Sequence, residues 1–197
     1  MEKRNIETKR KILHLLFGIV LVLLIKYGFM GKVHIFSSIV IALLISFLSK
    51  RYKIPGVNWF LHNFEREENI KKFPAKGFIF YLIGTFLVLL FFPKDIAMSA
   101  ILVLAFADSI GHIFGIKFGR IRHPFVSTKF IEGWIVGFIA GFIAASIVVP
   151  WYEALAASFF AMLVEGIEVK IGADEVDDNL IIPPVAAIAV WIVRTVF

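Results

Sequence analysis

The sequence has no cysteine, no glutamine and little charge. Because it has no Cys, the chain is not a disulfide-stapled secreted module. Charged residues make up 18% of it, whereas an average soluble domain has about 25%. The joint absence of Cys and Gln is typical of proteins made for high temperature. This composition argues against both a disordered chain and a soluble globular domain.

What the chain has instead is apolar: 59% of its 197 residues are hydrophobic, and 22 of them are Phe. A membrane-spanning helix needs about 20 apolar residues, so the chain has room for roughly eight or nine crossings and little else. We therefore predict an all-α integral membrane protein in a single domain, residues 1–197. Seven continuous apolar runs predict about seven transmembrane helices. These runs are Ile12–Tyr27, Val33–Leu48, Phe78–Phe92, Ile96–Ala107 continuing toward Phe118, Ile131–Val149, Trp151–Val164 and Leu180–Val196.

The basic residues are distributed unevenly between the segments that connect these runs. Seven crossings place the termini on opposite sides of the membrane. The N-terminal side then holds all of the 21 Lys and Arg except Lys26, Lys32, Lys94 and Arg194. By the positive-inside rule the N-terminus is cytoplasmic and the C-terminus lies on the opposite side. Most acids gather on the cytoplasmic side too, so we expect the functional site to face the cytoplasm, in contact with the lipid bilayer and with no nucleic-acid partner.

One acid interrupts an apolar run. Asp108 follows Ile96–Ala107, and a carboxylate inside a membrane helix costs about 2.5–3.5 kcal/mol, so it usually faces a cavity or a partner. After it, Gly111, Gly115 and Gly119 recur at every fourth residue and form one smooth helical stripe, which a ligand or another backbone can approach closely. The alternatives are a helix-end acid paired with a nearby Lys, and plain packing of small residues.

A second glycine stripe follows a basic loop that carries hydroxyl groups. Gly133, Gly137 and Gly141 again step by four, so the two stripes predict two closely packed helices with the loop between them. The loop residues Ser127–Lys129 precede a helix start, where backbone N–H groups and a lysine favour an anion such as phosphate. The loop is not a P-loop, because G-x-x-x-x-G-K-[ST] is absent. Glu132 is suited to cap the helix or to bind a cation.

Two further polar clusters fall on the same side. Arg10 and His14 are four residues apart, on one face of a helix that enters the membrane. The segment Asp174–Asn179 is rich in carboxylates and precedes the last apolar run. These acids lack EF-hand spacing, so Mg²⁺ shared between carboxylates and nucleotide phosphates fits better than Ca²⁺. The alternatives are a basic anchor with an interfacial His and a solvated acidic loop.

Four short motifs follow one another along the chain. They are E-x-x-R-K-x-x-H-x-x-x-G at Glu7–Gly18, K-G-x-x-x-Y at Lys76–Tyr81, a run from Ala107-Asp108 through Lys129 to Glu132-Gly133, and E…D-D-N-L-x-x-P from Glu165 to Pro183. In this order, they resemble the motifs of the polyprenol (dolichol), phytol and diacylglycerol kinases that use CTP. The third also resembles the core of the CDP-lipid synthases (phosphatidate cytidylyltransferases), whose S-P-K-K-T-x-E-G has two lysines where this chain has only Lys129. The first and last motifs favour the kinases.

The resemblance implies transfer of a phosphoryl group from CTP, the co-substrate, to the hydroxyl of a membrane isoprenoid alcohol, with Mg²⁺ or another divalent cation. It implies catalytic roles for Asp108, Lys129 and His14. The nucleotide-binding residues that we expect are Arg10, Lys11, Lys76, Gly111, Gly115, Gly119, Arg120, Ser127, Thr128, Glu132 and Gly133. The metal ligands that we expect are Asp108, Glu165, Asp177, Asp178 and Asn179.

Two other functions stay open at this point. A CDP-lipid synthase would attack the α-phosphate of CTP and release pyrophosphate, and a small non-catalytic transporter or assembly protein would do neither. The residues alone do not specify CTP over ATP, or dolichol over a shorter prenol or diacylglycerol. A homodimer is also open, because glycine stripes can pack within one chain or between two.

Overall fold

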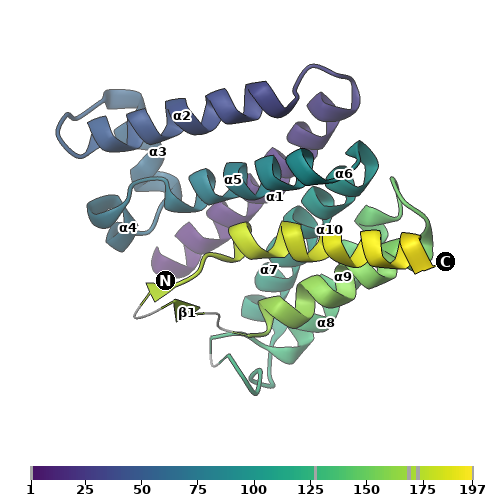
Figure 1. Ribbon diagram of the computed structural model, residues 1–197. Coiled ribbons are helices and arrows are strands. Elements are labelled where there is room, and N and C mark those ends of the chain that lie inside the picture. The colour runs from purple at the N-terminus through teal and green to yellow at the C-terminus, as the bar shows by residue number, and fades with distance from the viewer. Residues whose placement is uncertain (1, 127, 168–169, 172–173, 197) are drawn as a thin grey trace.

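The computed structural model is a bundle of helices (Figure 1). It describes residues 2–126, 128–167, 170–171 and 174–196, and their side chains except those of residues 2–5, 170, 171, 174 and 175. The described elements are α1 (Glu2–Lys26), α2 (Lys32–Ser49), α3 (Pro55–Phe64), α4 (Glu67–Lys72), α5 (Lys76–Phe91), α6 (Lys94–Val103), the π-helical segment η1 (Leu104–Asp108), α7 (Ser109–Phe118), α8 (Ile131–Ala145), α9 (Trp151–Glu165), the strands β1 (Lys170–Ile171) and β2 (Asp174–Glu175), and α10 (Asp178–Val196). The two strands pair as a short antiparallel hairpin.

Each of the seven predicted apolar runs forms a helix: α1, α2, α5, the continuous α6–η1–α7, α8, α9 and α10. In the described part of the chain, three helices are long and apolar enough to cross a membrane, namely α2, the helix from Lys94 to Phe118, and α10. Helices α5 and α8 are apolar but shorter. The helical class is therefore confirmed, whereas the number of crossings and the orientation stay predictions.

The helix from Lys94 to Phe118 is the centre of the bundle. Every residue from Ile96 to Val103 is buried, and α1, α5, α8, α9 and α10 all pack on α6 or η1. Small residues such as Ala97 and Ala100 let these neighbours approach closely. The peripheral helix α2 packs mainly on α5 and exposes most of its apolar side chains (Figure 1). The bundle therefore carries Asp108 on its most enclosed helix.

Helices α7 and α8 pack along the two glycine stripes. A Cβ atom added at Gly111 would lie 2.8 Å from the carbonyl oxygen of Gly133, and one added at Gly133 would lie 2.5 Å from that of Gly111. Only glycine allows two backbones to approach this closely. The prediction of two closely packed helices joined by the basic loop is confirmed.

One part of the fold was not predicted. Residues Pro55–Lys72, which we call the α3–α4 segment, form two short helices between α2 and α5. Helix α3 begins with Pro55 at its first turn, a position that proline favours, and buries Leu61. It packs on the N-terminal half of α1, where it helps to enclose the cavity described next.

Candidate functional site

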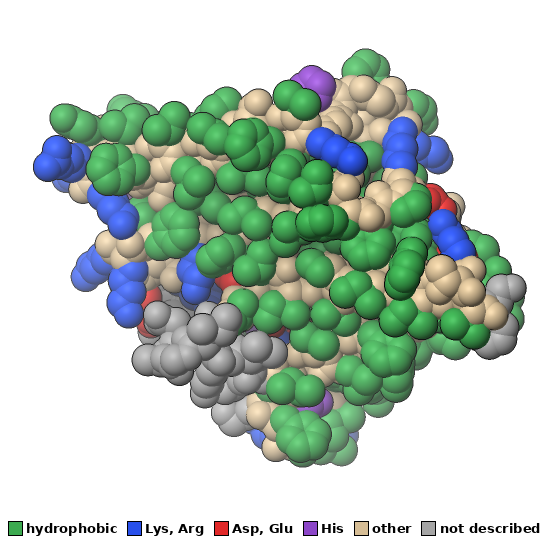
Figure 2. Space-filling model, viewed as in Figure 1, with side chains coloured by type: hydrophobic (Ala, Val, Ile, Leu, Met, Phe, Trp, Pro, Cys, Tyr) green, Lys and Arg blue, Asp and Glu red, His purple; other side chains and the backbone are tan. Residues whose placement is uncertain are grey.

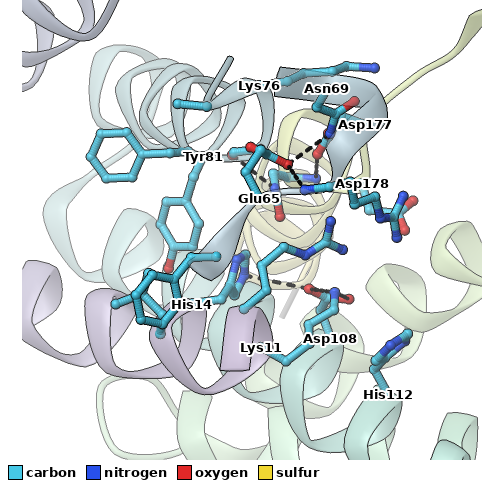
Figure 3. A pocket seen from close by; sticks show the side chains of 18 of the residues that line it. Lys11, His14, Glu65, Asn69, Lys76, Tyr81, Asp108, His112, Asp177 and Asp178 are labelled. Carbon is cyan, nitrogen blue, oxygen red and sulfur yellow. Dashed lines mark hydrogen bonds and ion pairs between the residues drawn. The ribbon is translucent and has the colours of Figure 1, made fainter. Parts of the chain in front are cut away.

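A cavity of about 610 Å³ opens at the end of the bundle that holds the N-terminus of α1. Its walls come from α1, the α3–α4 segment, the first turns of α5, η1, α7, the loop before α8, and the start of α10 (Figure 3). Cavities of roughly 300–1,000 Å³ are typical of small-molecule sites. The four motifs of the sequence therefore meet at one hollow.

Asp108 lies at the base of this cavity and is 3% exposed. The Nζ atom of Lys11 lies 2.5 Å from each of its carboxylate oxygens, and the two residues are 97 positions apart in the sequence (Figure 3). Asp108 is the last residue of η1, and single π-helical turns are frequent at functional sites. The sequence left open that Asp108 is an acid paired with a nearby lysine. The pairing is found, but the lysine comes from α1, far away in the sequence.

His14 stands beside this pair. Its Nε2 atom lies 3.6 Å from Oδ2 of Asp108, and its ring packs edge-to-face on Tyr81 at a centroid distance of 4.6 Å. In the described part of the chain, Nε2 of His14, the hydroxyl of Tyr81 and Nε2 of His112 are buried without hydrogen-bond partners. All three residues line the cavity. Buried polar atoms usually have partners, so this group points to a ligand or water in the cavity.

Lys129 connects the loop to two more carboxylates. Its Nζ lies 2.9 Å from Oε1 of Glu165 and 3.2 Å from Oδ2 of Asp178, and it donates a 2.7 Å hydrogen bond to the carbonyl of Glu165. Burial alone would lower the pKa of Lys129, but these two carboxylates raise it above its usual range. The lysine is therefore a permanent cation at the cavity.

Three of the predicted metal ligands come together. One carboxylate oxygen each from Asp108, Glu165 and Asp178 lies within 4.8 Å of the others. Opposite oxygens around Mg²⁺ are about 4.2 Å apart, because each Mg–O bond is about 2.1 Å. Oxygen ligands are what Mg²⁺ prefers, and a cation at this point would take the place of the ammonium groups of Lys11 and Lys129, which contact these carboxylates.

The other two predicted ligands have structural contacts. Asp177 caps α10, because its Oδ1 accepts the N–H of Asn179 at 3.1 Å. Burial raises the pKa of Asp177. The amide of Asn179 donates to the carbonyl of Gly77 at 3.0 Å. Pro183 has no N–H to bond the Asn179 carbonyl, and a Cβ atom at Gly84 would collide with that oxygen. These contacts hold the start of α10, which carries the last sequence motif, against α5, which carries the second.

The predicted nucleotide-binding residues divide into two groups. Arg10, Lys11, Lys76 and Thr128 line the cavity together with Lys129. The glycines instead contact protein, and the opposing backbone or the Phe130 ring fills the space beside them; they are Gly111, Gly115, Gly119 and Gly133. Gly111, Gly115 and Gly133 also line a small second pocket next to Lys129, so a role of the glycines in nucleotide binding stays a prediction.

Arg120 and Glu132 lie away from the large cavity. The carboxylate of Glu132 accepts the backbone N–H groups of Arg120 and Ile121 at 2.9 and 3.1 Å, so it holds the loop against the start of α8. Neither Arg120 nor Glu132 lines the cavity. Ser127 lies outside the described residues.

Sequence reasoning missed the wall that the α3–α4 segment contributes. Phe60, Phe64, Glu65, Arg66 and Asn69 all line the cavity. The Nε atom of Arg66 donates to Oε1 of Glu7 at 2.6 Å, and this bond ties the segment to α1. Glu7 belongs to the first motif, but the sequence does not show that Arg66 binds it. Arg66 lies in a charged stretch that looks like an ordinary solvent-exposed connection between helices.

These features define a class: a helical membrane protein with a cavity lined by charged residues at one end of its bundle. The chain is 32% identical over 185 residues to the uncharacterized protein MJ1137 of Methanocaldococcus jannaschii, an alignment that covers 92% of this chain and 91% of that protein. The chain belongs to the same family as this protein.

A second relative has a descriptive name. The chain is 27% identical over 135 residues to CTP-dependent diacylglycerol kinase 1 of Schizosaccharomyces pombe. This match covers 59% of the chain and 60% of the kinase, so it spans about three fifths of each. No family model matches the chain. No solved structure matches it either.

Proposed function

We propose that the protein is a kinase that transfers the γ-phosphoryl group of CTP to the hydroxyl group of a membrane lipid alcohol. The likeness to a CTP-dependent diacylglycerol kinase supports a CTP-dependent lipid kinase. The observation that carries the proposal is the cavity in which Lys11 and Lys129 meet a cluster of three carboxylates, two of which, Asp108 and Asp178, line it. Phosphoryl transfer needs positioning and charge neutralisation more than covalent chemistry, and this cavity offers both.

The basic residues of the cavity would hold the nucleotide. Arg10, Lys11, Lys76 and Lys129 reach it from three different parts of the chain, so they can surround a triphosphate. Asp108, Glu165 and Asp178 would hold Mg²⁺ or another divalent cation. When bound, the cation would neutralise charge on the β- and γ-phosphates.

Asp108 is the residue best placed to act on the lipid hydroxyl. Its carboxylate would orient the hydroxyl and take its proton, as a carboxylate does in other kinases. Lys11 holds this carboxylate in position through both oxygens, and His14 stands 3.6 Å from it. His14 would therefore position the same hydroxyl group.

An apolar wall would receive the lipid tail. Leu13 and Phe17 of α1 face the cavity together with Phe78 and Tyr81 of α5, and the rings of Phe17 and Phe78 are 5.0 Å apart. Phe78 is also 39% exposed, so this wall reaches the outer surface of the bundle. The tail would lie there, in the bilayer. The motifs resemble those of kinases for isoprenoid alcohols and for diacylglycerol alike, and the name of the fission-yeast relative states diacylglycerol.

The distribution of charge supports a cytoplasmic site in one domain with seven crossings. The two termini lie at opposite ends of the bundle, as an odd number of crossings requires (Figure 1). Basic side chains gather where α2 ends and α4 lies, other basic side chains lie at the opposite end of this face, and the surface between them is largely apolar (Figure 2). The exposed ones of the first group are Lys50, Arg51, Lys53, Lys71 and Lys72. By the positive-inside rule, this end would face the cytoplasm.

The test uses purified protein in detergent with Mg²⁺ and CTP labelled at either the α- or the γ-phosphate. A dolichol-type alcohol and diacylglycerol are offered as separate acceptors. Label from the γ-phosphate on the lipid is the expected result, and the better acceptor identifies the lipid class. Label from the α-phosphate would instead show a CDP-lipid synthase. No label from either position would favour a non-catalytic protein and contradict the proposal.

A further inference from the structure

The α3–α4 segment gives the cavity a wall that phosphoryl transfer alone does not require. Phe60 and Phe64 present two rings with centroids 5.1 Å apart, and Glu65 and Asn69 follow them on the same wall. In Figure 3, Glu65 and Asn69 lie in the upper part of the view, and Lys11 and Asp108 lie in the lower part. The wall thus combines flat apolar rings with polar groups in a fixed arrangement.

Glu65 is the unexpected member of this wall. It is 6% exposed, and its Oε1 accepts the backbone N–H of Arg66 at 3.0 Å and the amide of Asn69 at 2.9 Å. Within the described residues, its second oxygen, Oε2, accepts no hydrogen bond. Oε2 is not one of the fully buried atoms that lack a partner, so it is accessible, and Glu65 lines the cavity. An oriented acceptor is therefore left for a ligand that donates a hydrogen bond.

The two kinds of group together match the edge and the face of a nucleobase. Aromatic rings stack on the flat face of any base. A carboxylate accepts a hydrogen bond from the exocyclic amine of cytosine, and uracil presents a carbonyl oxygen at the same position. A lipid tail has no group that would satisfy Glu65, so the chemistry of this wall differs from that of the wall formed by Phe17 and Phe78.

We infer that the α3–α4 segment is the nucleobase subsite: Phe60 and Phe64 pack on the ring of cytosine, and Glu65 accepts a hydrogen bond from its amine. This inference rests on the proposed function and names the residues that select the nucleotide. The subsite belongs to the same cavity as Arg10, Lys76 and Lys129, so a triphosphate can extend from the base to these cations. The bond from Arg66 to Glu7 keeps the subsite fastened to α1.

The test compares Glu65→Gln with the wild type, using kcat/KM for CTP and for UTP. The neutral amide loses the charged acceptor for cytosine and gains a donor for the uracil carbonyl. We expect the preference for CTP over UTP to fall about tenfold or more, the usual effect of one such hydrogen bond. Glu67→Gln is the matched control, because Glu67 is exposed on α4 and does not line the cavity. An unchanged CTP/UTP ratio in Glu65→Gln would overturn the inference.

A binding measurement separates this inference from the proposed function. Isothermal titration of the wild type and Glu65→Gln with Mg²⁺ and CTP, UTP or ATP needs no acceptor lipid. A preference for CTP that disappears in Glu65→Gln supports the subsite, even if no phosphoryl transfer is found. Wild-type protein that binds UTP or ATP as tightly as CTP overturns it.

Phe64→Leu provides a second variant in case Glu65→Gln does not fold. The smaller, non-aromatic side chain weakens stacking, so we expect the KM for CTP to rise about tenfold while the KM for the lipid stays the same. The opposite result, a changed lipid KM with an unchanged CTP KM, would assign this wall to the lipid and overturn the inference.

Discussion

The bundle has a cluster of ion-paired side chains at each end, and the two clusters differ in how completely their polar atoms are paired. At the end away from the cavity, Arg194 of α10 binds Glu153 of α9 through two bonds of 2.9 and 2.6 Å, and it contacts Asp95 of α6 at 2.8 Å. Each carboxylate there has its cation, and none of these three residues lines the cavity.

At the cavity end the charged side chains are also paired, but polar atoms next to them make no hydrogen bonds within the described part of the chain. Lys11 and Lys129 pair with three carboxylates, and the buried polar atoms of His14, Tyr81 and His112 make no hydrogen bond to the described residues. Both ends contain buried ion pairs, so an ion pair alone does not identify a site. Open space and unsatisfied polar atoms next to the pair make the difference.

Asp108→Asn should lower phosphoryl transfer by about 10²–10⁴-fold, the usual contribution of a general base. The amide keeps the size of the side chain and can still accept a hydrogen bond from Lys11, so the fold should persist. The measurement is transfer of γ-labelled phosphate, with thermal unfolding as the check on folding. Full activity in this variant would remove Asp108 from the mechanism.

Arg194→Met should lower stability and leave the catalytic rate nearly unchanged. Removing one partner of a buried pair costs about 3–5 kcal/mol, and we expect a loss at the low end because Arg194 is about a third exposed. Thermal unfolding measures the loss, and activity is assayed well below the transition. The double variant Arg194→Met with Glu153→Gln should recover part of the stability, because it removes the unpaired charge. A large loss of kcat at low temperature would contradict the division between the two ends.

Gly133→Ala should destabilise the bundle by about 1–3 kcal/mol, because the added methyl group meets the backbone of Gly111 and Gly115 and forces α7 and α8 apart. Gly31→Ala is the matched control, since a Cβ atom there has no neighbour within 4 Å. Thermal unfolding of the two variants measures the difference. If Gly133→Ala weakens CTP binding without a loss of stability, the glycine contacts the nucleotide as the sequence motif implied.

Asn179→Ala should cost about 1 kcal/mol, the usual value of one hydrogen bond, here the bond to the Gly77 carbonyl. Because this contact joins two helices, we expect the Mg²⁺ concentration for half-maximal activity to stay the same. A metal titration of the variant tests this expectation. A marked rise in the Mg²⁺ concentration needed for half-maximal activity would show that Asn179 is a metal ligand.

Local patterns in the sequence predicted the helices well. The apolar runs are long, and each is bounded by charged residues, Pro or Gly, so α5, α8 and α10 could be located without knowledge of their neighbours. Asp108 was also visible, because a carboxylate in an apolar run is costly. These features depend on residues close together in the chain.

The rest of the site depends on contacts between distant segments. Nothing near Asp108 indicates that Lys11 would pair with it, and nothing near Glu7 indicates Arg66. The α3–α4 segment is short, and its periodicity is too brief to distinguish a cavity wall from a connection. The spacing of the glycine stripes suits helix packing and a ligand equally well. The packing of α7 on α8 shows the first, and the second stays a prediction.

The π-helical segment η1 has a consequence for the phase of the central helix. It places one more residue in a turn than an α-helix would, and one residue corresponds to about 100° of rotation around the axis. Every side chain after Asp108 is rotated by that amount relative to α6. The direction in which Asp108 points and the direction in which the glycine stripe of α7 points are therefore set by the same extra residue. Deleting one residue within Leu104–Asp108 would rotate Asp108 away from the cavity and the glycine stripe away from α8. The site and the packing of α7 on α8 therefore depend on the same extra residue.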